Sequence, residues 1–465
     1  MVFTTNFREQ LRRALSKPTN TIATNGTSAT MNPNESSPLL AVPSAHDGEP
    51  HFWRHLLFNR RHTPGVDSPN PLVRWPARTF DVTKVTLLSN PVNILLVFVP
   101  IGIVAGVREW SPTAVFTLNF FAIIPLAAVL SFATEEISVR LGDTLGGLLN
   151  ATFGNAVELI VSIVALKAGE IEVVQSSMLG SILSNLLLVM GMCFLLGGIW
   201  NMQDSDGRGM EQTFTTATAQ TTCSLMTLSS ASLVIPAALY GVLDHSDESD
   251  KQSSILLLSR GTAIILLALY VLYLYFQLRT HKNLFTPEDP REALEEEPEV
   301  SMSPWAAAAV LIVVTVVIAV CADYLVDSID AIVENYHISK NFIGLILLPI
   351  VGNAAEHVTA CVVALRNKMD LAMGVAIGSS IQIALLVTPF LVILGWFMGQ
   401  PMTLHFEMFE TIAFALSVLV VTYIVQDGKS NYLEGAMLMG LYLIIALAFW
   451  ASPSDMSSKF LAWLH

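Results

Sequence analysis

The chain has 465 residues, of which 53% are hydrophobic and only 13% are charged, and its mean hydropathy is +0.57. A soluble globular protein of this size is less apolar and more charged, so the composition predicts an integral membrane protein. The net charge of -14 argues against a nucleic-acid partner and favours cations.

Residues 1–85 come first in chain order and are rich in Ser, Thr, Asn and Pro. We expect this region to be disordered and cytosolic, because it has too few apolar residues to build a core. Its beginning lacks the apolar stretch of a signal peptide, so the first spanning helix must direct insertion. Glu35, Leu39 and Leu40 have the spacing of an acidic dileucine, which sorting adaptors read but which also recurs by chance.

Eleven apolar runs near the required length of about 20 residues follow, and we expect each run to form a transmembrane helix. The runs cover 91–107, 113–132, 146–168, 173–199, 215–240, 256–278, 304–322, 341–364, 371–397, 407–425 and 434–450. Basic residues close to the first run place the N-terminus in the cytosol. The expected fold class is therefore an all-α integral membrane protein with eleven helices and its C-terminus on the opposite side.

All four cysteines lie within these apolar runs without paired spacing, which indicates small hydrophobic residues rather than disulfides or a thiolate metal site. They are Cys193, Cys223, Cys321 and Cys361. The sequence also has no H-E-x-x-H or comparable histidine pair, which argues against a zinc site and an intramembrane metalloenzyme. We expect no enzymatic activity and no organic cofactor.

The third and eighth runs share a motif: "GNAVE" begins at Gly154 and "GNAAE" begins at Gly352. A second pair, "GSILSN" at Gly180 and "GSSIQI" at Gly378, lies 26 residues after the first in both cases (180 minus 154 and 378 minus 352). Two repeats of five helices enter the membrane from opposite sides, so the sequence predicts inverted-topology repeats. We expect a first helix at 90–107, repeats at 113–281 and 303–451, and an acidic cytosolic connection at 282–302.

Each repeat places a carboxylate and an amide on one face of a helix, because Asn155 and Glu158, like Asn353 and Glu356, are three residues apart. Pseudo-symmetry brings the two faces together. Two carboxylates and two amides, with further oxygens nearby, approach the 6 to 8 oxygen ligands that calcium takes. The expected supporting groups are the backbone at Gly154 and Gly352 and the side chains of Ser181, Ser184, Ser379 and Gln382.

The same carboxylates suit protons, because burial and mutual repulsion favour their protonated form when no metal is bound. A dication and protons then compete for the same charge, which is the basis of exchange. The alternative is that both glutamates are structural and bonded to neighbouring helices. His357 is either a packing residue or a proton relay, and Glu135 and Glu136 either line an aqueous path or form a solvated helix end.

Four stretches carry a family resemblance: "GNAVELIVSIVALKAG" with "GSILSNLLLVMG", and "PIVGNAAEHVTA" with "GSSIQIALLV". They resemble the two signature repeats of the vacuolar calcium/proton exchanger family, over about Asn90 to Ala451. The resemblance implies a calcium site at Glu158, Glu356, Asn155 and Asn353. It also implies transport of Ca2+ against H+ into an acidic organelle, and hence a multi-pass protein of the vacuolar membrane.

The stretch "PEDPREALEEEPEV", from Pro287 to Val300, has no EF-hand spacing. The resemblance implies an acidic helix here that concentrates cations at Glu292, Glu295, Glu296 and Glu297, and the alternative is a solvated linker.

The expected function is a Ca2+/H+ antiporter working by alternating access, with a sodium-coupled or broader divalent cation (Mn2+) exchanger as the alternative. A channel is disfavoured, because two repeats within one chain enclose one site.

Overall fold

The structure is a computed structural model that describes residues 63, 68–202, 209–242, 248–281 and 301–451, and every structural statement concerns these residues. Their regular secondary structure is helical apart from one antiparallel pair of short strands, β1 (Gln212–Thr213) and β2 (Lys429–Ser430). Eight helices are long and apolar enough to cross a membrane, or ten when two sharply bent helix pairs are counted. The all-α membrane class is confirmed, and the count of eleven and the inverted repeats stay predictions.

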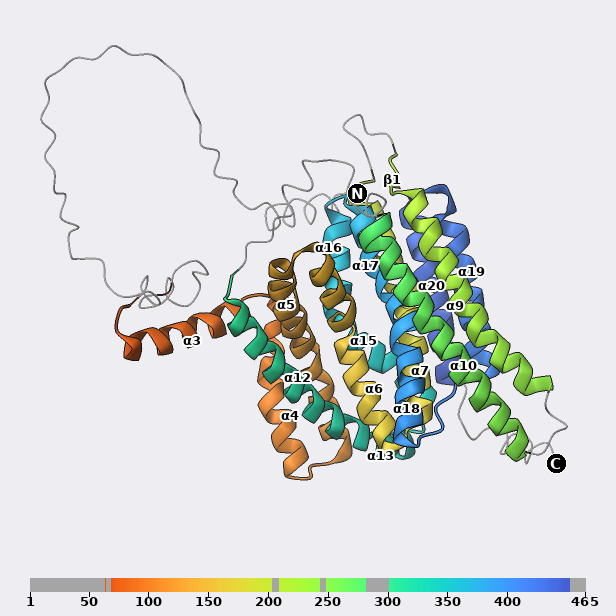
Figure 1. Ribbon diagram of the computed structural model, residues 1–465, viewed down its shortest axis with the longest axis horizontal. Coiled ribbons are helices and arrows are strands. Elements are labelled where there is room, and N and C mark those ends of the chain that lie inside the picture. The colour runs from red at the N-terminus through yellow and green to blue at the C-terminus, as the bar shows by residue number, and fades with distance from the viewer. Residues whose placement is uncertain (1–62, 64–67, 203–208, 243–247, 282–300, 452–465) are drawn as a thin grey trace, which may run out of the picture. The chain divides into compact units, whose positions relative to one another are not determined.

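The helices before the connection at 282–300 form the first half of the bundle (Figure 1). They are α3 (Pro71–Leu87), η1 (Pro91–Val97), α4 (Phe98–Val107), α5 (Pro112–Phe153), α6 (Ala156–Ala168), α7 (Ile171–Leu183), η2 (Ser184–Val189), α8 (Met190–Trp200), α9 (Thr216–Val242), α10 (Glu248–Tyr275) and η4 (Phe276–Thr280). Two of these segments, η2 and η4, are π-helical turns that continue the α-helix before them.

The helices after the connection form the second half. They are α12 (Pro304–Asp327), α13 (Ile329–Tyr336), α14 (Lys340–Phe342), η6 (Ile343–Leu347), α15 (Leu348–Gly352), α16 (Ala354–Leu365), α17 (Met369–Gln382), η7 (Ile383–Val387), α18 (Thr388–Met398), α19 (Met408–Ile424), η8 (Val425–Asp427) and α20 (Tyr432–Ala451). In Figure 1 the long α12 runs beside α4 and α5 of the first half.

Residues 71–87, which overlap the last part of the region expected to be disordered, form helix α3. The helix begins where the Asn70 side chain accepts a hydrogen bond from the Leu72 backbone N–H, with Pro71 at its first position. Apolar and basic residues alternate at helical spacing along it, and that amphipathic pattern is stable at an interface. The dileucine lies outside the described residues.

Helix α5 is two helices joined at Gly142, whose φ of 75° lies in the left-handed region that a side chain would strain. The first part is the expected second span. The second part and α6 together occupy the expected third span, with a break between them at Gly154 and Asn155. In the second half the matching break, at Asn353, bends the chain by 59° between the helices before and after it. Both copies of the first motif therefore interrupt a helix.

Both copies of the second motif lead into a π-helical turn. The span from α7 to α8 contains the π-turn η2, and the span from α17 to α18 contains η7. A π-turn widens the helix by one residue and re-aims the side chains around it, and such turns are frequent at functional sites. The packing at the motif glycines differs. A Cβ at Gly180 would overlap the Leu345 carbonyl of η6, whereas a Cβ at Gly378 would meet nothing within 4 Å.

A buried carboxylate of the first half anchors the start of the second half. Glu136 on α5 is 5% exposed and accepts hydrogen bonds from the backbone N–H groups of Ser301 and Met302, at 2.9 to 3.1 Å. The neighbouring Arg140 donates from Nη2 to the Met302 carbonyl at 2.7 Å. Hydrogen bonds to a charged acceptor are stronger than neutral ones, so this clamp fixes where α12 begins.

We expect Glu136→Ala to destabilise the protein by about 1–3 kcal/mol, because it leaves the buried Met302 N–H and the part-buried Ser301 N–H without their charged acceptor. The measurement is the midpoint of thermal unfolding of the purified protein in detergent. Glu135→Ala is the matched control, because the adjacent side chain is exposed and makes no described hydrogen bond. Equal midpoints for the two variants would show that the clamp contributes nothing.

Candidate functional site

The two motif glutamates occupy equivalent places on broken helices. Glu158 lies in the first turn of α6, three residues after Asn155. Glu356 lies in the first turn of α16, three residues after Asn353. The backbone N–H groups of a first turn have no helical partners, and the helix dipole is positive there. A carboxylate is therefore more stable at these positions than in the middle of an unbroken helix.

Side chains from the two halves meet around Asn155, which is 1% exposed. Its Nδ2 donates to Gln382 Oε1 at 2.6 Å, and its Oδ1 accepts from Ser379 Oγ at 2.8 Å. Both partners belong to the second motif of the second half. The structure thus brings Asn155 together with two predicted residues that lie more than two hundred positions later in the chain. The two hydrogen bonds fix the orientation of the Asn155 amide.

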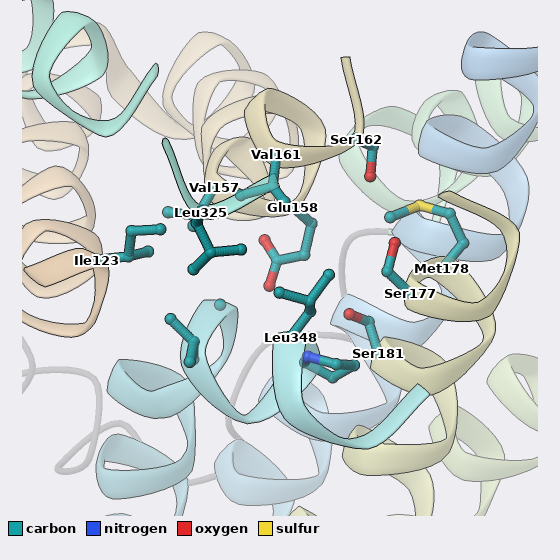
Figure 2. Close-up of a pocket in the computed structure, with 13 residues that line it drawn as sticks. Ile123, Val157, Glu158, Val161, Ser162, Ser177, Met178, Ser181, Leu325 and Leu348 are labelled. Atoms are coloured by element: carbon teal, nitrogen blue, oxygen red, sulfur yellow. The ribbon is translucent and has the colours of Figure 1, made fainter. Parts of the chain in front are cut away.

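Glu158 rests against the break in the other half of the chain. A Cβ added at Gly352 would lie 2.7 Å from Glu158 Oε1, so a glycine is required for this close approach. Figure 2 shows the Glu158 carboxylate pointing from α6 into a small cavity of about 20 Å³. Ser162, Ser177 and Ser181 supply the hydroxyl groups in its wall. That volume holds about one water molecule.

Several oxygen atoms of the site are buried without a hydrogen-bond partner among the described residues. They are Glu158 Oε1, Glu356 Oε2 and Asn353 Oδ1, and Asn353 Nδ2 is also unpartnered. Leaving a buried polar atom unpaired costs about 1–3 kcal/mol, and more for a charged group. Carboxylate and amide oxygens are the ligands that a hard cation such as Ca2+ takes. Glu158 Oε1 lies against Gly352, four residues before Glu356, so oxygen atoms of both motifs are near one another and the donor set fits a dication.

Glu356 faces a different and larger space than Glu158. It lines a vestibule of about 390 Å³ together with Ser379 and Gln382 of the site. Glu135, a predicted member of a proton path, lies in the same wall. Glu136 does not line the vestibule, because its carboxylate is bound to the start of the second half.

Sequence reasoning missed the other polar residues of the vestibule, which lie along α5, near the end of α10 and in η4. They are Ser131, Thr134, Asn150, Tyr270, Tyr273 and Gln277. Each is a single polar residue in or beside an apolar run, which is a weak signal by itself. The expected neighbours of this opening, Glu292 and Glu295 to Glu297, lie outside the described residues.

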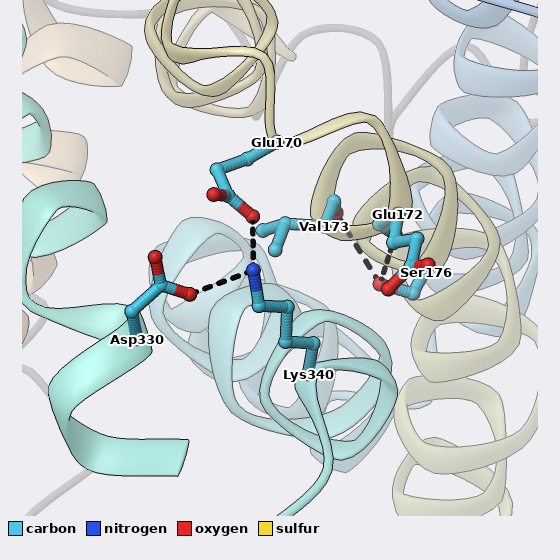
Figure 3. Close-up of polar contacts among 6 residues, drawn as sticks. All are labelled: Glu170, Glu172, Val173, Ser176, Asp330 and Lys340. Carbon is cyan, nitrogen blue, oxygen red and sulfur yellow. Dashed lines mark hydrogen bonds and ion pairs between the residues drawn. The ribbon is translucent and has the colours of Figure 1, made fainter. Parts of the chain in front are cut away.

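An ion-pair triad joins the two halves of the bundle at Lys340 (Figure 3). Lys340 Nζ lies 2.8 Å from Glu170 Oε2 and 2.6 Å from Asp330 Oδ1. Glu170 precedes α7 in the first half, and the other two residues belong to α13 and α14 of the second half. The triad therefore ties the two halves together on the far side of the site from the vestibule. Sequence reasoning gave Lys340 and Glu170 no role.

His357 is not among the described residues that line the two cavities of the site. It is 9% exposed, and its Nε2 atom is 3.2 Å from Ser184 Oγ, at the start of the π-turn η2. This contact joins two of the predicted residues, one from each half. The role of His357, as a packing residue or as a relay, stays a prediction.

No group of three or more His, Cys, Asp or Glu that could hold a metal occurs among the described residues.

These broken helices and their oxygen-lined site define a membrane protein that handles cations. Residues 111–279 and 306–451 match the sodium/calcium exchanger protein family, and the chain belongs to that family. The predicted family resemblance is confirmed.

Similar proteins carry names of the same kind. The chain is 53% identical over 372 residues to the vacuolar calcium ion transporter of Schizosaccharomyces pombe. The matched region covers 80% of this chain and 87% of that protein. It is 44% identical to the Ca2+/H+ antiporter of Aphanothece halophytica, over 77% of this chain and 96% of that protein. The solved structure of native YfkE is similar with a TM-score of 0.65 at 36% identity, over 78% of this chain and all of YfkE.

We expect Gly352→Ala to weaken calcium binding by about tenfold or more, because the added methyl group displaces the Glu158 carboxylate. The measurement is radioactive calcium binding to the purified protein. Gly440→Ala on α20 is the control, since a Cβ there meets nothing within 4 Å. Unchanged binding by a folded Gly352→Ala protein would show that the contact with Glu158 does not position a ligand.

Proposed function

We propose that the chain is a secondary antiporter that exchanges cytosolic Ca2+ for lumenal protons across the vacuolar membrane, with its N-terminus in the cytosol. The observation that carries the proposal is the pair of carboxylates at matched helix breaks, each with a buried oxygen that has no hydrogen-bond partner among the described residues. The names of the similar proteins support calcium and protons as the exchanged ions.

Calcium binding follows from the donor set. Glu158 and Glu356 supply two negative charges, which match the charge of one Ca2+. Asn353 supplies an amide oxygen that is free to bind, whereas the Asn155 oxygen already accepts from Ser379 and must exchange that bond for the ion. The first-turn positions of both glutamates are held by backbone hydrogen bonding in α6 and α16, so the ligands need little reorganisation when the ion arrives.

Protons replace calcium at the same atoms. When the ion leaves, two carboxylates remain close together in an apolar interior, and burial and mutual repulsion both favour their neutral form. A neutral carboxylic acid can remain in the bundle, whereas an unpaired carboxylate at the centre of a spanning helix costs about 2.5–3.5 kcal/mol or more. Calcium and protons therefore occupy the site in turn, which couples their movements.

The cavities support access from one side at a time. The vestibule leads to Glu356 from the end of the bundle where the acidic connection at 282–300 joins the two halves, which is the cytosolic end in the proposed topology. The opposite end is closed by the Lys340 triad. Opening toward the lumen requires this triad to separate. Two broken helices in register-matched halves fit the inverted repeats of secondary transporters.

A sodium-coupled or Mn2+-accepting exchanger is the alternative, since the matched family includes sodium/calcium exchangers by name. Uptake of calcium into vesicles with an imposed pH gradient, with and without sodium, separates the two. Proton coupling predicts uptake that needs the pH gradient and is indifferent to sodium. Uptake that follows a sodium gradient instead would overturn the proposed coupling.

We expect Glu158→Gln and Glu356→Gln each to reduce exchange to background, because the amide keeps the shape but removes the charge that both ions need. Glu356→Asp should also be poor, since the shorter arm opens ligand distances that calcium holds at about 2.3–2.6 Å. The measurement is calcium-triggered proton release from vesicles that contain purified, monodisperse protein.

Glu334→Gln is the control for loss of a carboxylate, because Glu334 is exposed on α13 and lines neither cavity of the site. It should transport at the wild-type rate. Substantial proton release by both Glu158→Gln and Glu356→Gln would instead mean that the two glutamates are structural.

We expect Lys340→Met to open the closed end, because it leaves Glu170 and Asp330 facing each other without the cation between them. Ser177→Cys in a background without native cysteines reports the opening, since Ser177 lines the small cavity at Glu158. Labelling by a membrane-impermeant thiol reagent from the triad side should become several-fold faster.

Lys167→Met is the matched control, since Lys167 is exposed near the same end and makes no described ion pair. It should leave the labelling rate unchanged. If Lys340→Met and Lys167→Met label at the same rate, the triad does not hold this end closed.

A further inference from the structure

A groove of about 1360 Å³ lies on the outside of the bundle, away from the two glutamates. Its walls come from α3, α5 and α12, with Leu96 of η1 at its side. None of the residues that line the two cavities of the site lines this groove. The proposed exchange cycle gives the groove no role, and its walls differ sharply in chemistry from one end to the other.

The end of the groove near α3 is positively charged. Arg78 of α3 and Arg140 of α5 both line it, and neither has a carboxylate partner among the described residues. Asp81 also lines the groove, but its Oδ1 lies 3.8 Å from the Lys84 ammonium, which offsets its charge. Two guanidinium groups beside one space, neither of them ion-paired within the described part of the chain, form a complementary surface for a phosphate group.

The rest of the groove is apolar and has the depth of a lipid leaflet. Along α12 the wall runs from Trp305 to Val314, nine residues on, or about 14 Å at the rise of an α-helix. Half of a bilayer's hydrocarbon core is about 15 Å. Leu126 and Val129 of α5 form the facing wall. An acyl chain would therefore find apolar contacts along its length within one leaflet.

Helix α3 is placed as a membrane-surface helix would be. It bends by 112° from the segment that follows it, so it does not continue the first span. Leu72 and Trp75 are 83% and 70% exposed, and Trp305 at the start of α12 is 86% exposed. Tryptophan is enriched at membrane interfaces, where its ring lies at the level of the headgroups. The two indoles and the two arginines therefore mark the headgroup level of the groove.

We propose that this groove binds an anionic phospholipid, with the phosphate on Arg78 and Arg140 and an acyl chain along the apolar wall of α5 and α12. A lipid at this place contacts α3, the first half and the start of the second half at once. It would fix α3 against the bundle beside Ser301 and Met302, where the second half begins.

The occupant must be apolar over most of its length. The chain's own acidic segment at 287–300 leads into the groove at Ser301 and complements the arginines in charge. Its glutamates and prolines cannot cover a leaflet-deep wall of valine and leucine, however, because burying unpaired charge there is costly. A free phosphate would satisfy the arginines and leave the same wall bare. A phospholipid satisfies both parts.

The test uses the full chain, reconstituted in phosphatidylcholine with a minor fraction of phosphatidylserine, then re-extracted and analysed for retained lipid by mass spectrometry. We expect the wild type to retain phosphatidylserine in preference, at about one molecule per chain. Arg78→Gln with Arg140→Gln should lose this preference several-fold. Val313→Trp places a bulky side chain in the apolar part of the groove and keeps both arginines, and it should also lower phosphatidylserine retention. This variant tests the proposal if the double arginine variant does not fold.

Arg279→Gln with Arg366→Gln is the matched control, because it removes the same charge at exposed residues that do not line the groove. It should behave as the wild type. Equal retention by Arg78→Gln with Arg140→Gln would overturn the proposal. The proposal would also be overturned if soluble glycerophosphoserine, which has no acyl chains, displaced the retained phosphatidylserine as effectively as added phosphatidylserine does. Increased retention after Glu292, Glu295, Glu296 and Glu297 are changed to Gln would also overturn it, because the acidic segment would then be the native occupant.

Discussion

The burial of two carboxylates inside an apolar helical bundle is the constraint on which the rest of this structure depends. An ionised carboxyl group in such a place must be paired, protonated or bound to a cation. Within the part of the chain that the structure describes, Glu158 and Glu356 have no basic partner in the cavities they line, and an oxygen of each is buried without a hydrogen bond. The protein instead places both in first helical turns, where unpaired backbone N–H groups and the helix dipole stabilise negative charge.

Broken helices make those first turns possible at the middle of the bundle. Breaking a spanning helix frees backbone groups that must be satisfied by protein or by a water-lined cavity. The breaks at Asn155 and Asn353 lie beside the two cavities, and the glycine at 352 allows Glu158 to approach the opposite break. The surroundings of the two carboxylates nevertheless differ, because Glu158 faces a cavity of about 20 Å³ and Glu356 faces a vestibule of about 390 Å³. The two glutamates therefore have unlike surroundings, although the two motifs that carry them are nearly identical in sequence.

Interactions between the two halves explain features that the motif alone leaves open. Glu136 and Arg140 fix the start of α12, while the Lys340 triad joins the halves at the other end. One set of contacts is buried and the other is partly exposed to water. Charged hydrogen bonds in a buried position resist separation, whereas exposed ion pairs contribute about 0–1 kcal/mol and separate easily. The bundle is thus held firmly near its connection and more weakly at the end that the proposed cycle must open.

The sequence by itself determined the membrane class, the family and the residues of the paired motif, because apolar length and repeated spacing are properties of the chain alone. It also indicated that Asn155 and Gln382 belong to one site, although it could not show their hydrogen bond. Only the tertiary structure separated Glu135 from Glu136, one in the vestibule and the other bonded to the second half, since neighbours in a helix point in different directions. It also decided the fold of residues 71–87 and the pairing of Lys340, because both depend on surfaces that distant segments of the chain supply.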